Sequence, residues 1–209
     1  MPAMPPTAPR MPTRLAECAF ELFSERGFEA VTIDEIAARA GVTKGSFYSH
    51  YRSKQEIVHA ACAHYYRAYQ QRVQAELAGV VDPLERLTHV LELSVRTCVL
   101  DRGHRVFTTE IFALLLQDDE IRKGWSQFYD TAREMYVGLV MAAVAAGQLE
   151  ASDPRRAVDL MLATMEGVKM RAAFETQIGD AEEQRAVVAS LLGILTSPPY
   201  QPAASALPS

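Results

Sequence analysis

Apolar residues recur along most of this chain with the spacing of an α-helix, and no stretch shows the sustained alternation of a β-strand. In 13–26 they fall at i, i+3, i+4, i+7 and i+8, at Leu15, Cys18, Ala19, Leu22 and Phe23. Comparable patterns predict further helices over 33–40, 44–51, 54–79, 83–100, 105–117, 120–146, 154–174 and 180–196. We therefore expect an all-α fold with about nine helices.

The second and third of these helices are short and are joined by a tight turn. Thr32 and Glu35 have the spacing of a capping box, which fixes the start of the second helix. Gly41 ends it, because glycine enters the left-handed conformation without steric cost. Thr43 caps the helix that follows. Two helices joined by a glycine turn, with the second presented to the major groove of DNA, are typical of a helix-turn-helix.

The outward face of the third helix is suited to close contact with another surface. On a helical wheel Phe47 marks the buried side, and small residues lie opposite. A second capping box, Ser53 with Glu56, places Lys54 at a helix N-terminus, where backbone N–H groups and the helix dipole favour anions. The outward and flanking residues are Lys44, Gly45, Ser46, Tyr48, Ser49 and His50.

The local charge also favours contact with a polyanion. Between Ala37 and Gln55 the chain has four basic residues and no Asp or Glu, although its total net charge is −5. A basic strip on an acidic protein indicates a located contact rather than general stickiness. The four residues are Arg39, Lys44, Arg52 and Lys54.

The segment from Arg14 to Ile57 closely resembles the N-terminal domain of the TetR/AcrR family of one-component transcriptional regulators. The matching residues at fixed spacing are Arg14-Leu15, Ala19, Leu22-Phe23, Gly27-Phe28, Thr32, Glu35-Ile36-Ala37, Ala40-Gly41-Val42-Thr43, Gly45, Tyr48, His50-Tyr51, Ser53-Lys54 and Ile57. Beyond about residue 60 the resemblance is only architectural. It implies a homodimeric repressor that binds a palindromic double-stranded DNA operator and leaves it when a small lipophilic or aromatic molecule binds.

The resemblance also assigns roles to individual residues. DNA contacts are expected from Thr32, Thr43, Lys44, Gly45, Ser46, Tyr48, Ser49, His50 and Lys54. Tyr48, His50 and Lys54 match positions that grip the DNA backbone, whereas Lys44 could equally meet a base edge or a phosphate. The last two helices should form a four-helix bundle with a second protomer. The expected interface residues are Met161, Thr164, Gly167, Val168, Leu191 and Leu195.

The chain is therefore expected to contain two domains between two tails. Proline-rich segments 1–12 and 198–209 are predicted to be disordered. Residues 13–58 form the DNA-binding domain and 59–197 the ligand-binding and dimerisation domain. Large, soft side chains concentrate after residue 106 and could line an apolar pocket, with an ordinary packed core as the alternative. The predicted ligand residues are Tyr66, Phe107, Ile111, Trp125, Phe128 and Tyr129.

Composition narrows the remaining possibilities. With 209 residues, 49% of them hydrophobic and 22% charged, the chain is typical of a soluble globular protein. We expect a cytoplasmic protein, because no apolar run reaches the about 18 residues that span a bilayer and the N-terminus has no apolar leader. No catalytic motif or metal-ligand spacing is present, so we expect no enzyme activity, cofactor or metal.

Two alternatives to a ligand-responsive regulator stay open. One is an unregulated or architectural DNA-binding protein with a filled C-terminal core. The other is a redox sensor that uses Cys62 or Cys98, which requires an exposed thiol near a positive group.

Overall fold

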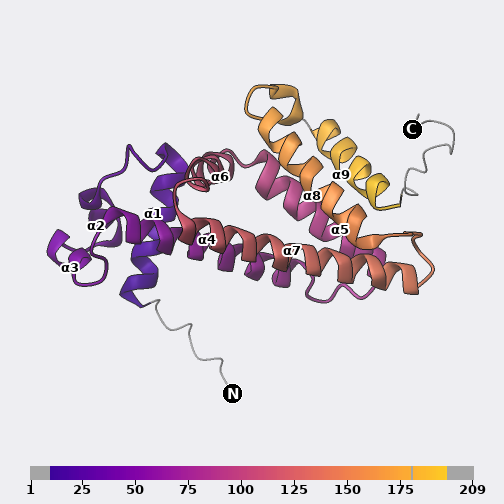
Figure 1. Cartoon of the computed structure of the whole chain (residues 1–209), viewed down its shortest axis with the longest axis horizontal. Coiled ribbons are helices and arrows are strands. Elements are labelled where there is room, and N and C mark those ends of the chain that lie inside the picture. The colour runs from indigo at the N-terminus through magenta and orange to yellow at the C-terminus, as the bar shows by residue number, and fades with distance from the viewer. Residues whose placement is uncertain (1–9, 180, 197–209) are drawn as a thin grey trace, which may run out of the picture. The chain divides into compact units, whose positions relative to one another are not determined.

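The computed structural model describes residues 10–179 and 181–196, and within these ranges it contains nine α-helices and no β-strand (Figure 1). The all-α prediction is confirmed. The helices are α1 (Met11–Arg26), α2 (Ile33–Ala40), α3 (Lys44–Tyr48), α4 (Lys54–Glu76), α5 (Pro83–Ser94), α6 (Arg102–Leu114), α7 (Asp119–Ala145), α8 (Pro154–Arg171) and α9 (Ala181–Thr196). A π-helix, η1 (Val95–Leu100), and a 3₁₀ turn, η2 (Thr176–Gly179), complete the described elements. None of the described helices is long and apolar enough to cross a membrane.

The internal contacts of the chain divide it into two compact units. Of the described residues, unit 1 comprises those up to Gln74 together with Asp101–Phe128, and unit 2 comprises Ala75–Leu100 and those from Tyr129 onward. Helices α4 and α7 each contribute residues to both units. The division into a DNA-binding domain at 13–58 and a regulatory domain at 59–197 follows expected function rather than compactness, and it stays a prediction.

The short helices of unit 1 are held by their apolar faces. Phe23 of α1, Ile36 of α2 and Phe47 of α3 are all 0% exposed. Burial of side chains of this size contributes roughly 1.5–3 kcal/mol each. Helix α1 packs against both α2 and α6. This packing is needed because helices as short as α2 and α3 are marginal in isolation.

The N-terminal helix begins earlier than predicted. Its first residue is Met11 rather than Thr13, with Pro12 in the first turn. Proline is tolerated there because its missing N–H would have no partner inside the helix. The predicted tail 1–12 is therefore helical at its last two residues. Arg10 is the N-cap of α1, and residues 1–9 lie outside the described residues. The predicted tail 198–209 also lies outside the described residues.

Other helix ends also differ from the prediction: α4, α6 and α8 each end three residues earlier than predicted. Helix α3 ends at Tyr48 instead of residue 51, because the N–H of His50 donates to the Phe47 carbonyl at 2.9 Å in a tighter turn. Helix α6 begins at Arg102 instead of residue 105. The earlier start is fixed by Asp101, which caps α6 by accepting the His104 N–H at 2.8 Å.

In unit 2 the predicted single helix over 83–100 changes character after Ser94, where α5 gives way to η1. The Ser94 hydroxyl donates to the Val90 carbonyl at 2.7 Å, and the Thr97 hydroxyl donates to the Leu93 carbonyl at 2.7 Å. Such bonds compete with backbone N–H groups for the same carbonyls and distort helices. Helices α8 and α9 lie side by side and pack directly (Figure 1).

Candidate nucleic-acid interface and effector site

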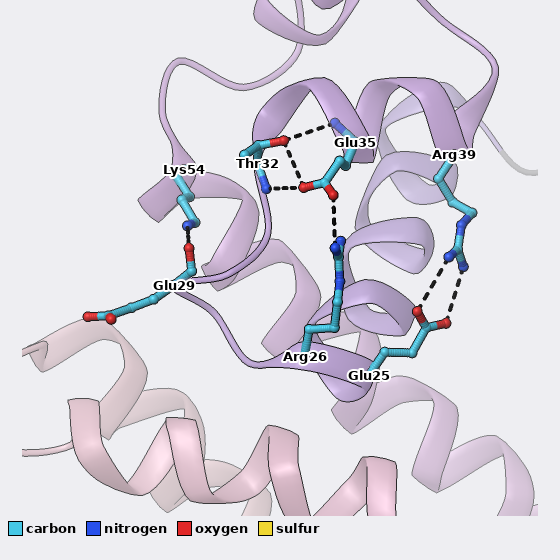
Figure 2. Close-up of polar contacts among 7 residues, drawn as sticks. All are labelled: Glu25, Arg26, Glu29, Thr32, Glu35, Arg39 and Lys54. Atoms are coloured by element: carbon cyan, nitrogen blue, oxygen red, sulfur yellow. Dashed lines mark hydrogen bonds and ion pairs between the residues drawn. The ribbon is translucent and has the colours of Figure 1, made fainter.

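The start of α2 is fixed by a reciprocal capping box, as predicted (Figure 2). The Thr32 hydroxyl oxygen accepts the Glu35 N–H at 3.3 Å, and the Glu35 carboxylate accepts the Thr32 N–H at 2.8 Å. Arg26 donates to the same carboxylate at 2.9 Å. The Arg26 hydrogen bond, followed by those from Thr32, lowers the pKa of Glu35 to about 2. Thr32 therefore has a structural role, whatever contact it also makes with DNA.

The turn and the recognition helix follow the local signals in the sequence. Gly41 has a φ of 75°, in the left-handed region. The Thr43 hydroxyl oxygen accepts the Ser46 N–H at 3.2 Å and so caps α3. The predicted DNA contacts Thr43, Lys44, Gly45, Tyr48, Ser49 and His50 are exposed, and Ser46 and Lys54 are half-buried.

Gly45 leaves open space at the outward surface of α3. A Cβ atom built there would have Thr43 Oγ1 as its nearest neighbour, at 3.8 Å. The backbone of α3 can therefore approach another surface closely at this point. Tyr48, on the flank, is 47% exposed although it is large and aromatic.

Three of the four cations of the basic strip have partners within the protein. Lys44 Nζ lies 3.0 Å from a carboxylate oxygen of Asp34. Arg39 pairs with Glu21 at 3.2 Å and with Glu25 at 3.5 Å. Lys54 instead donates to the backbone carbonyl of Glu29 at 3.1 Å (Figure 2). The net positive charge of the strip is therefore lower than the sequence suggests, because these acidic partners lie outside the strip.

Five of the six predicted ligand residues belong to unit 1 and lie in or beside a group of contacting rings. The Tyr66 ring stacks on Phe128 with centroids 5.0 Å apart, and Trp125 lies 5.6 Å from Phe128. Phe107 joins them through Tyr65, at 5.5 Å. We call the following rings the aromatic cluster: Tyr65, Tyr66, Tyr69, Phe107, Phe112, Trp125 and Phe128. Phe107 and Ile111 are 0% exposed and Trp125 is 8% exposed.

Tyr66 is the one polar group of this cluster that the structure leaves unsatisfied. Its hydroxyl is buried and has no hydrogen-bond partner among the residues that the structure describes. Burial raises the pKa of Tyr66, so the hydroxyl stays protonated. An unmet donor of this kind costs about 1–3 kcal/mol. Gly124 lies against the ring, and a Cβ there would be 3.3 Å from Tyr66 Cε2.

A polar link joins the first turns of α4 to the start of α7. His59 Nε2 lies 2.7 Å from a carboxylate oxygen of Asp118, and Gln55 donates to the same oxygen at 3.0 Å. The other carboxylate oxygen of Asp118 accepts the backbone N–H groups of Glu120 and Ile121. Asp118 therefore caps α7 and holds α4 at once. The sequence signal was weak, because these partners are about sixty residues apart.

Family models cover most of this chain. Residues 15–61 match the model of bacterial regulatory proteins of the tetR family. Residues 83–196, more than half of the chain, match the model of the C-terminal region of BetI-type transcriptional repressors. The chain belongs to the TetR family of transcriptional regulators. Members of this family bind DNA, and the helix-turn-helix described above is the matching element.

Individual relatives agree with this assignment. Transcriptional regulator AcuR of Cereibacter sphaeroides is 30% identical over 82% of this chain and 87% of its own length. The uncharacterized HTH-type transcriptional regulator YerO of Bacillus subtilis is 36% identical, but over only 32% of this chain and 24% of that protein. A solved structure of a putative transcriptional regulator from Saccharomonospora viridis, in complex with choline, shares the fold. Its TM-score is 0.77 and its identity 21%, over 87% of this chain and 95% of that one.

In this TetR-family chain, the predicted ligand residue Tyr129 makes polar contacts of its own. It belongs to unit 2, where its hydroxyl donates to the carboxylate of Glu166. Lys169, only 4% exposed, forms an ion pair with the same carboxylate. Burial, then the charge of Glu166, raises the pKa of Tyr129. Glu166 engages the Tyr129 hydroxyl, and the expectation that Tyr129 lines one site with the aromatic cluster stays a prediction.

The predicted interface residues of this TetR-family chain fall on different sides of α8 and α9. Met161, Leu191 and Leu195 are 0% exposed within a single chain, so their side chains fill the core and cannot meet a partner. The spacing showed an apolar face but not which way it pointed. Thr164 and Val168 are half-buried and Gly167 is exposed. The large apolar side chains that are exposed on the described part of α8 and the segment after it are Leu160, Met170 and Phe174, at 58%, 53% and 72%.

The Cys62 thiol lacks the exposure and the low pKa that a redox sensor requires. This thiol is buried, and burial, followed by the nearby charge of Asp118, raises its pKa to about 12. A thiol with such a pKa is almost entirely protonated at neutral pH and is a poor nucleophile. Cys98 is half-buried, with its sulfur 3.7 Å from the Thr97 hydroxyl oxygen.

Unit 2 also has a surface groove that the sequence did not predict. Its volume is about 460 Å³, and it runs between α5, η1 and α9. Its lining is mixed: Val95, Val188 and Leu192 are apolar, whereas Arg96 and Arg185 are charged. The volume is within the range of ligand sites, but an open, charged groove suits a lipophilic molecule less than an enclosed apolar one.

Proposed function

We propose that this TetR-family chain is a repressor that binds a palindromic operator as a homodimer and is released by a small lipophilic or aromatic effector. The observation that carries the proposal is the exposed face of α3. Gly45 leaves its surface open, and Tyr48 and His50 are exposed beside it. A narrow helix with a small-residue face fits the major groove, and hydrogen-bonding side chains at its flanks fit the phosphates on either side.

The roles proposed for individual side chains follow from their places. Tyr48, His50 and Lys54 would hold phosphates, and Ser46 and Lys44 lie in the first turn of α3, where base edges are usually met. Lys54 is paired with a neutral carbonyl, and no carboxylate among the described residues is bonded to it, so its full charge is available for a phosphate. Thr32, Thr43 and Ser49 would act mainly by shaping the helix ends, since their hydroxyls are engaged there.

The dimer proposal is supported by the outward face of α8. Leu160, Thr164, Gly167 and Met170 follow helical spacing, and none of them is fully buried. Nothing lies within 4 Å of a Cβ built on Gly167, so this face is open within the protomer. Gly167→Leu should block close approach of a partner helix and produce monomers in sedimentation at low micromolar concentration. Gly138→Leu, at an exposed glycine of α7 that also has nothing within 4 Å of a built Cβ, is the matched control and should stay dimeric.

The effector site is proposed at the aromatic cluster. The buried Tyr66 hydroxyl could donate to an acceptor on the ligand, and the rings around it offer an apolar lining. Aromatic rings also attract quaternary ammonium groups, and a solved relative was crystallised with choline, so cationic amines belong in the ligand panel. The link from α4 to Asp118 would carry a displacement of these helices toward the DNA-binding residues.

The test begins with a duplex selected from a random library by the purified protein. Affinity for that duplex is measured across a panel of lipophilic, aromatic and quaternary ammonium compounds, with Trp125 fluorescence as the binding signal. An active compound should change the fluorescence, release the duplex and restore transcription from a promoter that carries it. Tyr66→Phe removes only the hydroxyl, so it should weaken the effector without changing DNA affinity in its absence. Constant DNA affinity across the panel would favour the unregulated DNA-binding protein.

A further inference from the structure

The first turn of α1 contacts the chain on both sides of the recognition helix. Arg14 Nε donates to the carbonyl of Ala40, the last residue of α2, at 3.0 Å. The hydroxyl of Tyr51, which follows α3, donates to the Pro12 carbonyl at 3.0 Å. Helix α3 has only five residues, which is about 7.5 Å of helix. A turn that bonds to the segments before and after so short a helix lies directly beside it.

The bond to Ala40 leaves most of the Arg14 guanidinium available. Arg14 is exposed, and Nε is engaged by a carbonyl, which is neutral. No carboxylate in the described part of the chain forms an ion pair with Arg14, including that of Glu17, one turn further along α1. The two terminal nitrogens therefore keep their donors and the group keeps its full charge. Because Nε is already bonded, less rotational freedom is lost when the terminal nitrogens bind an anion.

Arg14 differs in this respect from two cations of the basic strip. Lys44 and Arg39 are each paired with carboxylates. Each of these two must leave a carboxylate before it binds a phosphate, whereas Arg14 can keep its bond to Ala40 and bind through its terminal nitrogens. A cation placed next to a DNA phosphate releases counterions and so gains affinity for any sequence. Arg14 is therefore better prepared for a phosphate contact than Lys44 or Arg39, although it lies outside the strip in sequence.

We propose that Arg14 is a further DNA-contacting residue, whose terminal nitrogens bind a backbone phosphate at the edge of the groove that α3 enters. The inference rests on the proposed operator binding through α3. A helix in the major groove lies between two rows of phosphates, and a cation held beside that helix is placed to meet one of them. The planar guanidinium suits this contact, since two of its N–H groups can bond two oxygens of one phosphate. Such a contact positions the protein on DNA and carries no sequence information.

Arg14→Gln tests this inference, because it removes the charge. Affinities are measured for the selected duplex and for a shuffled duplex of equal composition, over a range of salt concentrations. At about 200 mM salt both affinities should fall by the same factor, about two- to fivefold. The loss should be about three to four times larger at about 50 mM salt, because one phosphate contact contributes about one unit of salt slope. Arg14→Lys keeps the charge and should retain the slope of the parent protein.

Arg102→Gln is the matched control for a plain change in net charge. Arg102 is exposed, belongs to the same unit and forms no ion pair with the residues that the structure describes. A Cβ built on the next residue, Gly103, would lie 3.3 Å from Ser24 Cβ, near the other end of α1. Ser24 is about 15 Å along the helix from Arg14. This separation exceeds the Debye length of about 10 Å at about 0.1 M salt, so the control should leave the salt slope nearly unchanged.

A purely structural role of Arg14 would give a different result. If its bond to Ala40 only holds the turn, Arg14→Gln should lower the free energy of unfolding in urea and the operator affinity, with the salt slope unchanged. The inference is wrong if the slope stays unchanged, if only the selected duplex is weakened, or if Arg102→Gln changes the slope equally. The proposed function fails separately, when the parent protein binds selected and shuffled duplexes alike. A slope that still depends on Arg14 would then leave the phosphate contact standing without operator recognition.

Discussion

The DNA-binding residues and the aromatic cluster belong to the same compact unit, but they differ in exposure. Gly45, Tyr48 and His50 lie on the surface, where they support little of the core. Phe107 and Trp125 are buried among other rings, so any ligand there must move side chains that also stabilise the fold. Substitutions on α3 should therefore change DNA binding without changing stability, whereas substitutions in the aromatic cluster should change effector binding and stability together.

The largest effect is expected when the open surface at Gly45 is filled. Gly45→Val adds a branched side chain where the backbone should approach DNA, so operator affinity should fall to the random-DNA level, about 10³-fold or more. The melting temperature should stay nearly unchanged, because valine is no worse than glycine in a helix and has room here. Band-shift titration and thermal unfolding measure the two properties. Gly45→Ala is the control and should lose less affinity.

The next largest effect is expected in the buried aromatic cluster. Phe107→Ala should destabilise the protein by about 3–5 kcal/mol, because it leaves a hole at a ring that is 0% exposed and contacts Phe20, Phe28 and Tyr65. Urea denaturation gives the change in free energy of unfolding. Phe107→Leu keeps most of the volume and should cost less. If Phe107→Ala kept its stability and lost only its effector response, function and stability would be separable at the aromatic cluster, contrary to this expectation.

The sequence predicted best what is decided by neighbours along the chain. The helix starts after Thr32 and Thr43 were correct, since each cap bonds an N–H three residues later. Asp101 shows the limit of the same signal. The sequence predicted that the next helix begins at residue 105, but Asp101 caps a helix that already begins at Arg102.

Features that depend on residues distant in sequence could not be predicted. The partners of Tyr129 and His59 lie thirty-seven and fifty-nine residues away. Periodicity also placed Met161 and Leu191 on apolar faces without showing that these faces point into the core of their own chain. The Lys44 ion pair spans only ten residues, but it requires the turn at Gly41 to bring α2 and α3 together.

A smaller effect is expected from loss of the α2 cap. Thr32→Ala removes the acceptor for the Glu35 N–H and should cost about 1 kcal/mol of unfolding free energy. Thr32→Ser retains the hydroxyl and should restore most of it, as measured by thermal unfolding. An equal loss in both variants would mean that the threonine methyl group, rather than the cap, supports α2.

The smallest effect should come from the charge of Glu35, and it depends on pH. Its folded pKa of about 2 is below its ordinary value of 4.5, so its ionised form stabilises the fold above pH 4.5. That contribution is lost as the pH falls toward 2. Glu35→Gln keeps a side chain able to complete the capping box but removes the charge, and the Arg26 ion pair with it.

The melting temperature of Glu35→Gln should therefore be slightly below that of the parent protein at about pH 6. The two curves should converge between about pH 4.5 and pH 2, because the parent loses the same charge by protonation. About 1 M salt should narrow the gap at pH 6, since both partners in this ion pair are exposed. A difference in melting temperature that persists unchanged to pH 2 would mean that Glu35 acts through the shape of its side chain and not through its charge. The polar contacts of α2 would then respond to pH no more than the packing of the aromatic cluster does.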